Sequence, residues 1–75
     1  MNLPEFDKLE PGDKVVALKD IFTYDEELKS KFYWADKGEV LYVQRNYYRG
    51  FAVVGPKRDS EESSFVVRHT EVGVE

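Results

Sequence analysis

The sequence predicts a mainly all-β fold: a single five-stranded barrel with a long loop or short helical turn between strands 1 and 2. Three observations lead to this expectation. The chain has 75 residues, which allows one domain. Five short runs are rich in residues that favour strands, and Gly and Pro separate them. A closed barrel would also limit the exposed edges of so small a sheet. The expected strands are Asp13–Lys19, Lys37–Arg45, Tyr48–Gly55, Ser63–His69 and Thr70–Val74.

The first expected strand follows a turn at Pro11-Gly12. The residues from Val15 to Leu18 are apolar without a break, so we expect both faces of this strand to be at least partly covered. Residues 1–10 are assigned to an N-terminal arm, and residues 11–75 to the barrel domain.

The interval from Asp20 to Asp36 has a different character. Residues 23–26 read TYDE, which has the form of a capping box. In such a box the Thr23 hydroxyl accepts a hydrogen bond from a helix amide, and Glu26 reaches back to the Thr23 amide. The pattern therefore predicts one or two helical turns here. The alternative is a long irregular loop.

The stretch from Tyr48 to Gly55 is expected to be mostly core. Phe51 and Val53 fall on one face of a strand, and Ala52 and Val54 fall on the other. One of these two faces should fill the barrel.

The same stretch imitates the RNP1 signature of RNA-recognition motifs, in which strand aromatics stack on bases. Arg49-Gly50-Phe51-Ala52 fits the first four positions, but two aromatic positions hold Val53 and Pro56. The helix and strand that must follow that motif are also missing, so we reject it. Gly50 is expected instead to permit a positive φ at the hairpin entry, and Pro56 to end the strand.

The pattern of glycines and valines resembles the small SH3-like barrels. PGDKVVAL, a long loop, KGEVLYV, a hairpin, SFVVRH and TEVGVE follow one another as in those barrels, which end with a tight turn and a short last strand. Gly38, Val40 and Val43 resemble the KOW motif in particular. The resemblance implies a fold, shared by KOW modules and by accessory subunits of larger complexes, and leaves function open. The ALYDY signature of peptide-binding SH3 domains is lacking, so proline-rich ligands are not implied.

The charge of the chain is acidic overall and unevenly distributed. Fifteen acids and eleven bases give a formal charge of −4, which argues against a typical nucleic-acid module. From Val40 to Arg58, however, there are four bases and no acid, whereas acids gather at residues 25–27 and 59–62. This pattern indicates a local basic face on an acidic body. The alternative is ordinary fluctuation of charge on solvated faces.

The chain has no cysteine, so it can form neither a disulfide nor a thiolate site. It has no apolar run near the ~18 residues of a membrane span, and its N-terminus lacks the apolar region of a signal peptide. A cytoplasmic protein with no membrane partner is expected.

Eleven aromatic residues exceed what the core of so small a domain needs. Trp, Tyr and Arg dominate interface hot spots. If the 20–36 interval packs beside the turn that follows the second strand, some of these residues would form one partner-binding surface, although Trp34 alone could be a core or rim residue. The candidate residues are Tyr24, Tyr33, Trp34, Arg45, Tyr47, Tyr48 and Arg49.

No catalytic or metal-binding pattern stands out. His69 is the only histidine and is expected in a turn or at the barrel rim, with no second ligand at metal spacing. Asp59, Glu61 and Glu62 lack the ligand alternation of a calcium loop. No nucleophile elbow or phosphate loop is present. We expect no enzyme activity, no cofactor, no metal and no small-molecule substrate.

The sequence thus favours a non-enzymatic accessory or regulatory module that binds a larger protein or nucleoprotein assembly. One alternative is a KOW-like module that contacts RNA or a nucleoprotein complex of transcription or translation, with weak direct binding of nucleic acid. A second alternative is a small phage-type inhibitor of a host enzyme.

Overall fold

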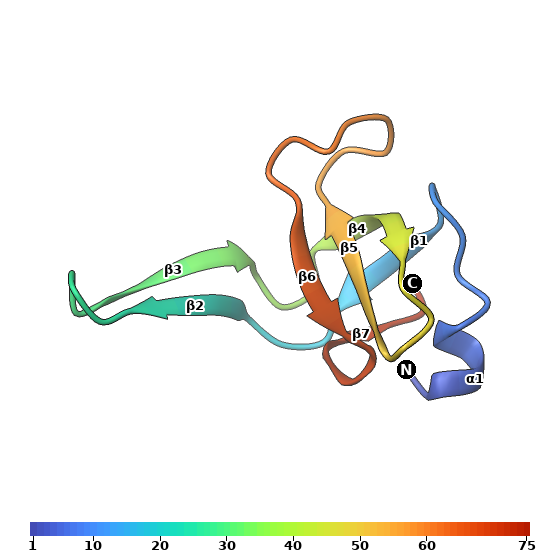
Figure 1. The fold of residues 1–75 in the computed structure, drawn as a ribbon, viewed down its shortest axis with the longest axis horizontal. Coiled ribbons are helices and arrows are strands. Elements are labelled where there is room, and N and C mark those ends of the chain that lie inside the picture. The colour runs from blue at the N-terminus through green and yellow to red at the C-terminus, as the bar shows by residue number, and fades with distance from the viewer.

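The computed structural model describes all of residues 1–75 and is mostly β, which confirms the expected class (Figure 1). It has seven strands, a short α-helix and one 3₁₀ turn. In chain order these are α1 (Leu3–Phe6), β1 (Lys14–Ala17), β2 (Ile21–Asp25), β3 (Ser30–Ala35), β4 (Val40–Asn46), β5 (Phe51–Gly55), β6 (Phe65–Arg68), η1 (His69–Glu71) and β7 (Val72–Gly73).

Five of the strands form an antiparallel sheet in the order β6-β5-β4-β1-β7. Four of them lie within the runs expected from the sequence, and β4 extends one residue beyond its run, to Asn46. No ladder joins β6 to β7, so this sheet is not a closed barrel, and the expectation of closure was wrong. The strand count was also wrong, because two further strands form a second sheet.

The second sheet is the antiparallel hairpin β2–β3, which occupies the interval expected to be a loop or a helical turn. β2 alternates β-branched and aromatic residues, and β3 carries three consecutive aromatic residues, Phe32 to Trp34. Both residue types favour strand pairing over a helix. Thr23 therefore lies inside β2 and caps nothing. The turn is stabilised by Asp25, whose Oδ1 accepts hydrogen bonds from the amides of Glu27 at 2.9 Å and Leu28 at 3.2 Å.

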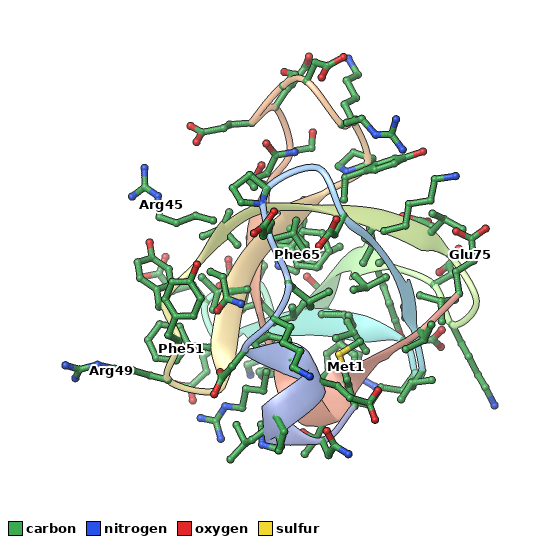
Figure 2. All side chains as sticks on the ribbon, turned by 90° about the vertical axis from the view of Figure 1, so that its right-hand side faces the viewer. Met1, Arg45, Arg49, Phe51, Phe65 and Glu75 are labelled. Carbon is green, nitrogen blue, oxygen red and sulfur yellow. The ribbon has the colours of Figure 1, made fainter.

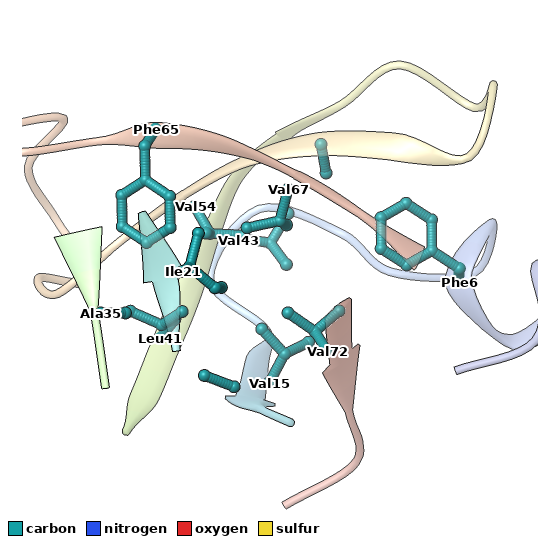
Figure 3. Packing of buried hydrophobic residues seen from close by; sticks show 12 residues of the cluster. Phe6, Val15, Ile21, Ala35, Leu41, Val43, Val54, Phe65, Val67 and Val72 are labelled. Atoms are coloured by element: carbon teal, nitrogen blue, oxygen red, sulfur yellow. The ribbon is translucent and has the colours of Figure 1, made fainter. Parts of the chain in front are cut away.

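The core lies on one face of the main sheet (Figure 3). Val15 pairs with Leu41 across β1 and β4, and Val43 pairs with Val54 across β4 and β5. Phe65 lies at one end of this core, beside the hairpin base, and Phe6 lies at the other. The twelve buried apolar residues are Phe6, Val15, Ala17, Ile21, Ala35, Leu41, Val43, Ala52, Val54, Phe65, Val67 and Val72.

The alternation expected along β5 is present, and Ala52 and Val54 form the inner pair. In β1 the expectation of two covered faces holds only in part. Val16 is half-buried, but Leu18, just past the strand, is 46% exposed.

Residues 1–10, expected as an arm, pack onto the sheet. The side chain of Asn2 caps α1 by accepting a hydrogen bond from the Glu5 amide at 2.9 Å. Phe6 is 1% exposed and closes the end of the core. The buried Asn46 side chain donates from Nδ2 to the carbonyl oxygens of Phe6 at 2.9 Å and Leu9 at 3.2 Å. These bonds attach α1 to the end of β4.

Candidate functional site

The β2–β3 hairpin projects away from the main sheet and produces the longest dimension of the molecule, 37 Å against 25 and 22 Å (Figure 1). Its base is anchored by Ile21 and Ala35, which face each other and are both buried. The register shifts between Ile21 and Phe22, so Trp34 has no residue directly opposite. Beyond this bulge every residue of both arms is exposed.

One face of the hairpin, here called the tyrosine face, carries Phe22, Tyr24 and Tyr33 together with Lys31. The pairing of Phe22 with Tyr33 and of Tyr24 with Lys31 places all four side chains on one side. The rings of Phe22 and Tyr33 are 5.5 Å apart, and Lys31 Nζ lies 4.6 Å from the Phe22 ring centroid. The three aromatic residues are 45 to 52% exposed.

The opposite face, here called the tryptophan face, carries Thr23, Phe32 and Trp34. The rings of Phe32 and Trp34 meet edge to face at 4.7 Å. Trp34 Nε1 donates a hydrogen bond to Thr23 Oγ1 at 2.9 Å, and the indole stacks on Phe65 of β6 at 5.6 Å. Phe32 remains 57% exposed and Trp34 37%. This face therefore continues from the core rim onto the hairpin.

An isolated two-stranded hairpin is only marginally stable in water, and most hairpins bury at least one apolar face. This hairpin buries neither of its two faces. An aromatic side chain carries ~150–250 Å², so the five exposed fractions correspond to roughly 500 Å² of aromatic surface. Divided between the two faces of the hairpin, this area is more than half of the ~800 Å² per partner of a standard interface.

The hairpin is also acidic. From Ile21 to Ala35 it contains three acids (Asp25, Glu26, Glu27) and two lysines (Lys29, Lys31), a net charge of −1, and Asp20 and Asp36 at its base bring the segment 20–36 to −3. Three of the acids are consecutive at the tip. The hairpin would repel the phosphates of a nucleic acid and attract a basic surface.

The structure divides the seven candidate residues into two groups. Tyr24, Tyr33 and Trp34 lie on the hairpin, whereas the other four lie at the end of β4 and in the β4–β5 turn, far from the hairpin (Figure 1). These four are Arg45, Tyr47, Tyr48 and Arg49. The single continuous surface expected from the sequence is not formed, because the hairpin extends outward and does not fold against that turn.

The β4–β5 turn is a second, smaller exposed site. The amide of Tyr48 donates to Asn46 Oδ1 at 2.9 Å, and Tyr48 adopts a φ of +58°. Gly50 has the positive φ expected of it, +84°. The Tyr47 ring lies 5.1 Å from Phe51, and Tyr48 is 61% exposed.

Both arginines of this group are exposed. Figure 2 shows Arg45 and Arg49 pointing outward on the side of the main sheet that also carries Phe51.

Sequence reasoning missed two members of the site, Phe22 and Phe32. Both lie at alternate positions with residues that were recognised, Tyr24 and Trp34 respectively. The signal was the recurrence of aromatic residues at every second position, at Phe22 and Tyr24 and again at Phe32 and Trp34. It was obscured by the helical interpretation of the TYDE sequence.

The polar residues considered in the sequence as metal ligands, His69 and the acids of the 59–62 loop, contact other parts of the protein. His69 is half-buried in η1, where its Nδ1 lies 2.9 Å from the Met1 carbonyl oxygen and its ring meets Phe6 edge to face. In the acidic loop, the hydrogen bond and charge of Lys57, at 2.9 Å, lower the pKa of the Glu62 carboxyl. No three His, Asp or Glu side chains meet in a cluster suited to a metal ion.

Comparison with protein-family models, with curated proteins and with solved structures finds no match for this chain. None of its helices combines the length and the apolar character needed to cross a membrane.

Proposed function

We propose that this chain is a non-enzymatic accessory or regulatory module that binds a partner protein through the β2–β3 hairpin. The observation that carries the proposal is an aromatic surface on both faces of a projecting hairpin whose tip is acidic. A hairpin exposed on two faces fits a cleft that covers both of them. The complementary partner is a protein with an apolar cleft and a basic rim.

Charge favours this partner over two other occupants. A nucleic acid would meet three consecutive acids at the tip. A second hairpin of the same kind would bring another tip of three consecutive acids against the first. A basic protein surface is attracted by the same negative charge, and the aromatic side chains supply the area that binding buries.

The SH3-like fold is part of the proposal. It is supported by the antiparallel order of the main sheet and by the 3₁₀ turn η1, which feeds a short last strand that pairs with β1. In this arrangement the hairpin is an insertion between β1 and β4. Inhibition of a host enzyme by a phage-type regulator is one form that such binding could take.

Site-specific photo-crosslinking tests the proposal. A benzophenone amino acid replaces Phe32 on the hairpin in one version of the full chain and Val66 in another. Val66 is the matched control because it is 58% exposed on β6 and lies outside the hairpin. After irradiation in cells of the source organism, we expect one discrete protein adduct from the Phe32 position only. No adduct, or the same adducts from both positions, would contradict the proposal.

A further inference from the structure

A second feature of the molecule lies on the outer face of the main sheet. The 56–64 loop lies at the top of Figure 1. Beside this loop the surface forms a shallow, open hollow of about 620 Å³. The residues that line it come from β1, from β4 and from the loop. They are Lys14, Tyr42, Pro56, Lys57, Arg58, Asp59 and Ser60.

The register of three strands creates this hollow. Lys14 lies opposite Tyr42, and Tyr42 lies opposite Gly55, so the three form one row across β1, β4 and β5. Their chain neighbours Val15, Leu41 and Val54 are buried in the core, so the side chains of Lys14 and Tyr42 point to the outer face. Gly55 ends the row without a side chain, and Ser64 of the loop packs against it, since a Cβ there would lie 3.0 Å from Ser64 Oγ.

Contacts within the loop hold two cations over this row. The Gln44 side chain donates from Nε2 to the Lys57 carbonyl oxygen at 2.6 Å, and the Lys57 ammonium pairs with Glu62 at 2.9 Å. The next residue, Arg58, places its guanidinium 5.1 Å from the centre of the Tyr42 ring. Of the cations used by the proposed site, Arg58 is therefore held against Tyr42 before any ligand arrives, which reduces the entropic cost of binding.

The hollow has an excess of positive charge in an acidic protein. Three cations and one acid, Asp59, line it. Lys57 is neutralised by Glu62, but neither Lys14 nor Arg58 has a carboxylate oxygen within 4 Å, since the protein contains only two ion pairs. Two cations without partners next to a tyrosine side chain form a site for an anion.

We propose that this hollow binds a phosphate group through Lys14 and Arg58. Arg58, in the loop, can donate to phosphate oxygens in a planar fork, and Lys14 adds a compact charge from β1. The Tyr42 hydroxyl is a further donor. The phosphate could belong to a free polyphosphate or to the backbone of a single-stranded nucleic acid. This site is separate from the hairpin and does not depend on the function proposed for it.

The test is an amide NMR titration of the full chain with two probes, sodium pyrophosphate and oligouridine, at low and physiological salt. We expect the largest shifts at Lys14, Tyr42 and Lys57–Arg58. The double variant K14A/R58A should bind at least about tenfold more weakly, as removal of charged hydrogen bonds predicts. The matched control R45A/R49A also removes two positive charges, from outside the hollow, and should keep most of the affinity. Because all four side chains are exposed, both variants should fold, and their spectra verify this.

The two probes distinguish between the two sources of the phosphate group. Pyrophosphate binding as tight as that of oligouridine indicates a free polyphosphate, whereas tighter oligouridine binding with a steep salt dependence indicates a nucleic-acid backbone. The proposal is overturned by the absence of shifts with both probes at low salt. It is equally overturned if both double variants lose the same affinity, because the attraction would then be one of general charge.

Discussion

The indole of Trp34 stacks on the ring of Phe65 at a centroid distance of 5.6 Å and an interplanar angle of 26°. Trp34 belongs to the projecting hairpin, and Phe65 is a core residue that is 8% exposed. The same indole donates to Thr23 Oγ1 across the hairpin at 2.9 Å. One side chain thus joins the two hairpin arms to each other and to the main sheet. It fixes the direction in which the candidate binding surface points.

Replacement of this side chain should loosen the hairpin before the rest of the fold. For Trp34→Ala we expect a loss of about 1–3 kcal/mol in the free energy of unfolding, because a partly exposed aromatic contact is removed. Amide hydrogen exchange in β2 and β3 should accelerate more than exchange in β4 and β5. The control Thr23→Val removes only the hydrogen-bond acceptor and should cost about 0.5–1.5 kcal/mol. Unchanged hairpin exchange in Trp34→Ala would contradict this role.

Asn46 should be required for the attachment of α1. Its amide donates to two carbonyl oxygens, and an aspartate at this buried position would place negative charge against both of them. We expect Asn46→Asp to lower the free energy of unfolding by about 2–4 kcal/mol at neutral pH. The same change at exposed Asn2 keeps a good helix cap but loses the bond from Nδ2 to Glu5 Oε1 at 3.1 Å, and should cost about 1 kcal/mol or less. Denaturant unfolding of both variants measures the difference, and equal losses would exclude a special role for Asn46.

Gly50 is expected to tolerate no side chain. Its φ of +84° disfavours other residues, and a Cβ would lie 3.2 Å from Leu3 Cδ2 and 3.3 Å from His69 Cδ2. Gly50→Ala should therefore cost about 1–3 kcal/mol in stability, the sum of backbone strain and crowding. Gly38 has a similar φ of +92° but open space around it, so Gly38→Ala measures the backbone cost alone. If both substitutions shift the melting temperature equally, the contact with Leu3 and His69 is unimportant.

The ion pair between Lys57 and Glu62 can be detected through the pKa of the Glu62 carboxyl. The hydrogen bond and charge of Lys57 lower the pKa of Glu62 in the folded protein from its usual 4.5. Because the pKa of Glu62 is lower in the folded protein than in the unfolded chain, the pair stabilises the fold at a pH above the pKa of the unfolded chain. This stabilisation is lost as the pH falls through the pKa of the folded protein. Carboxyl NMR titration should therefore show the Glu62 pKa rising in Lys57→Met. An unchanged titration curve would mean that the pair does not form in solution.

The sequence predicted the main sheet better than the hairpin. Each strand of the sheet lies in a run bounded by Gly, Pro or polar turns, and such local signals can be recognised without the tertiary structure. The hairpin was missed because Thr23–Glu26 matches a capping box, whereas the β-forming residues on both arms favour strands. Tyr24 and Asp25 are compatible with either structure, and only the pairing of Thr23 with Phe32 decides between them.

The candidate sites were predictable to different degrees. Tyr33 and Trp34 stand out by residue type alone, so they were recognised in the sequence. The position of Tyr47 and Tyr48 relative to them depends on where the hairpin points, which no local pattern encodes. The hollow was missed because Lys14 and Tyr42 meet only through the register of β1 with β4.

The affinity of hairpin and turn variants for the partner captured at Phe32 tests whether the hairpin is the binding surface. The double variant F22S/F32S removes one aromatic side chain from each face of the hairpin, whereas Y47A/Y48A removes two exposed aromatic side chains from the β4–β5 turn. If the hairpin is the binding surface, F22S/F32S should lose at least about 100-fold in affinity while Y47A/Y48A remains within about threefold of the original chain. The opposite order, measured on variants whose NMR spectra show an intact fold, would mean that the β4–β5 turn binds the partner and the hairpin does not.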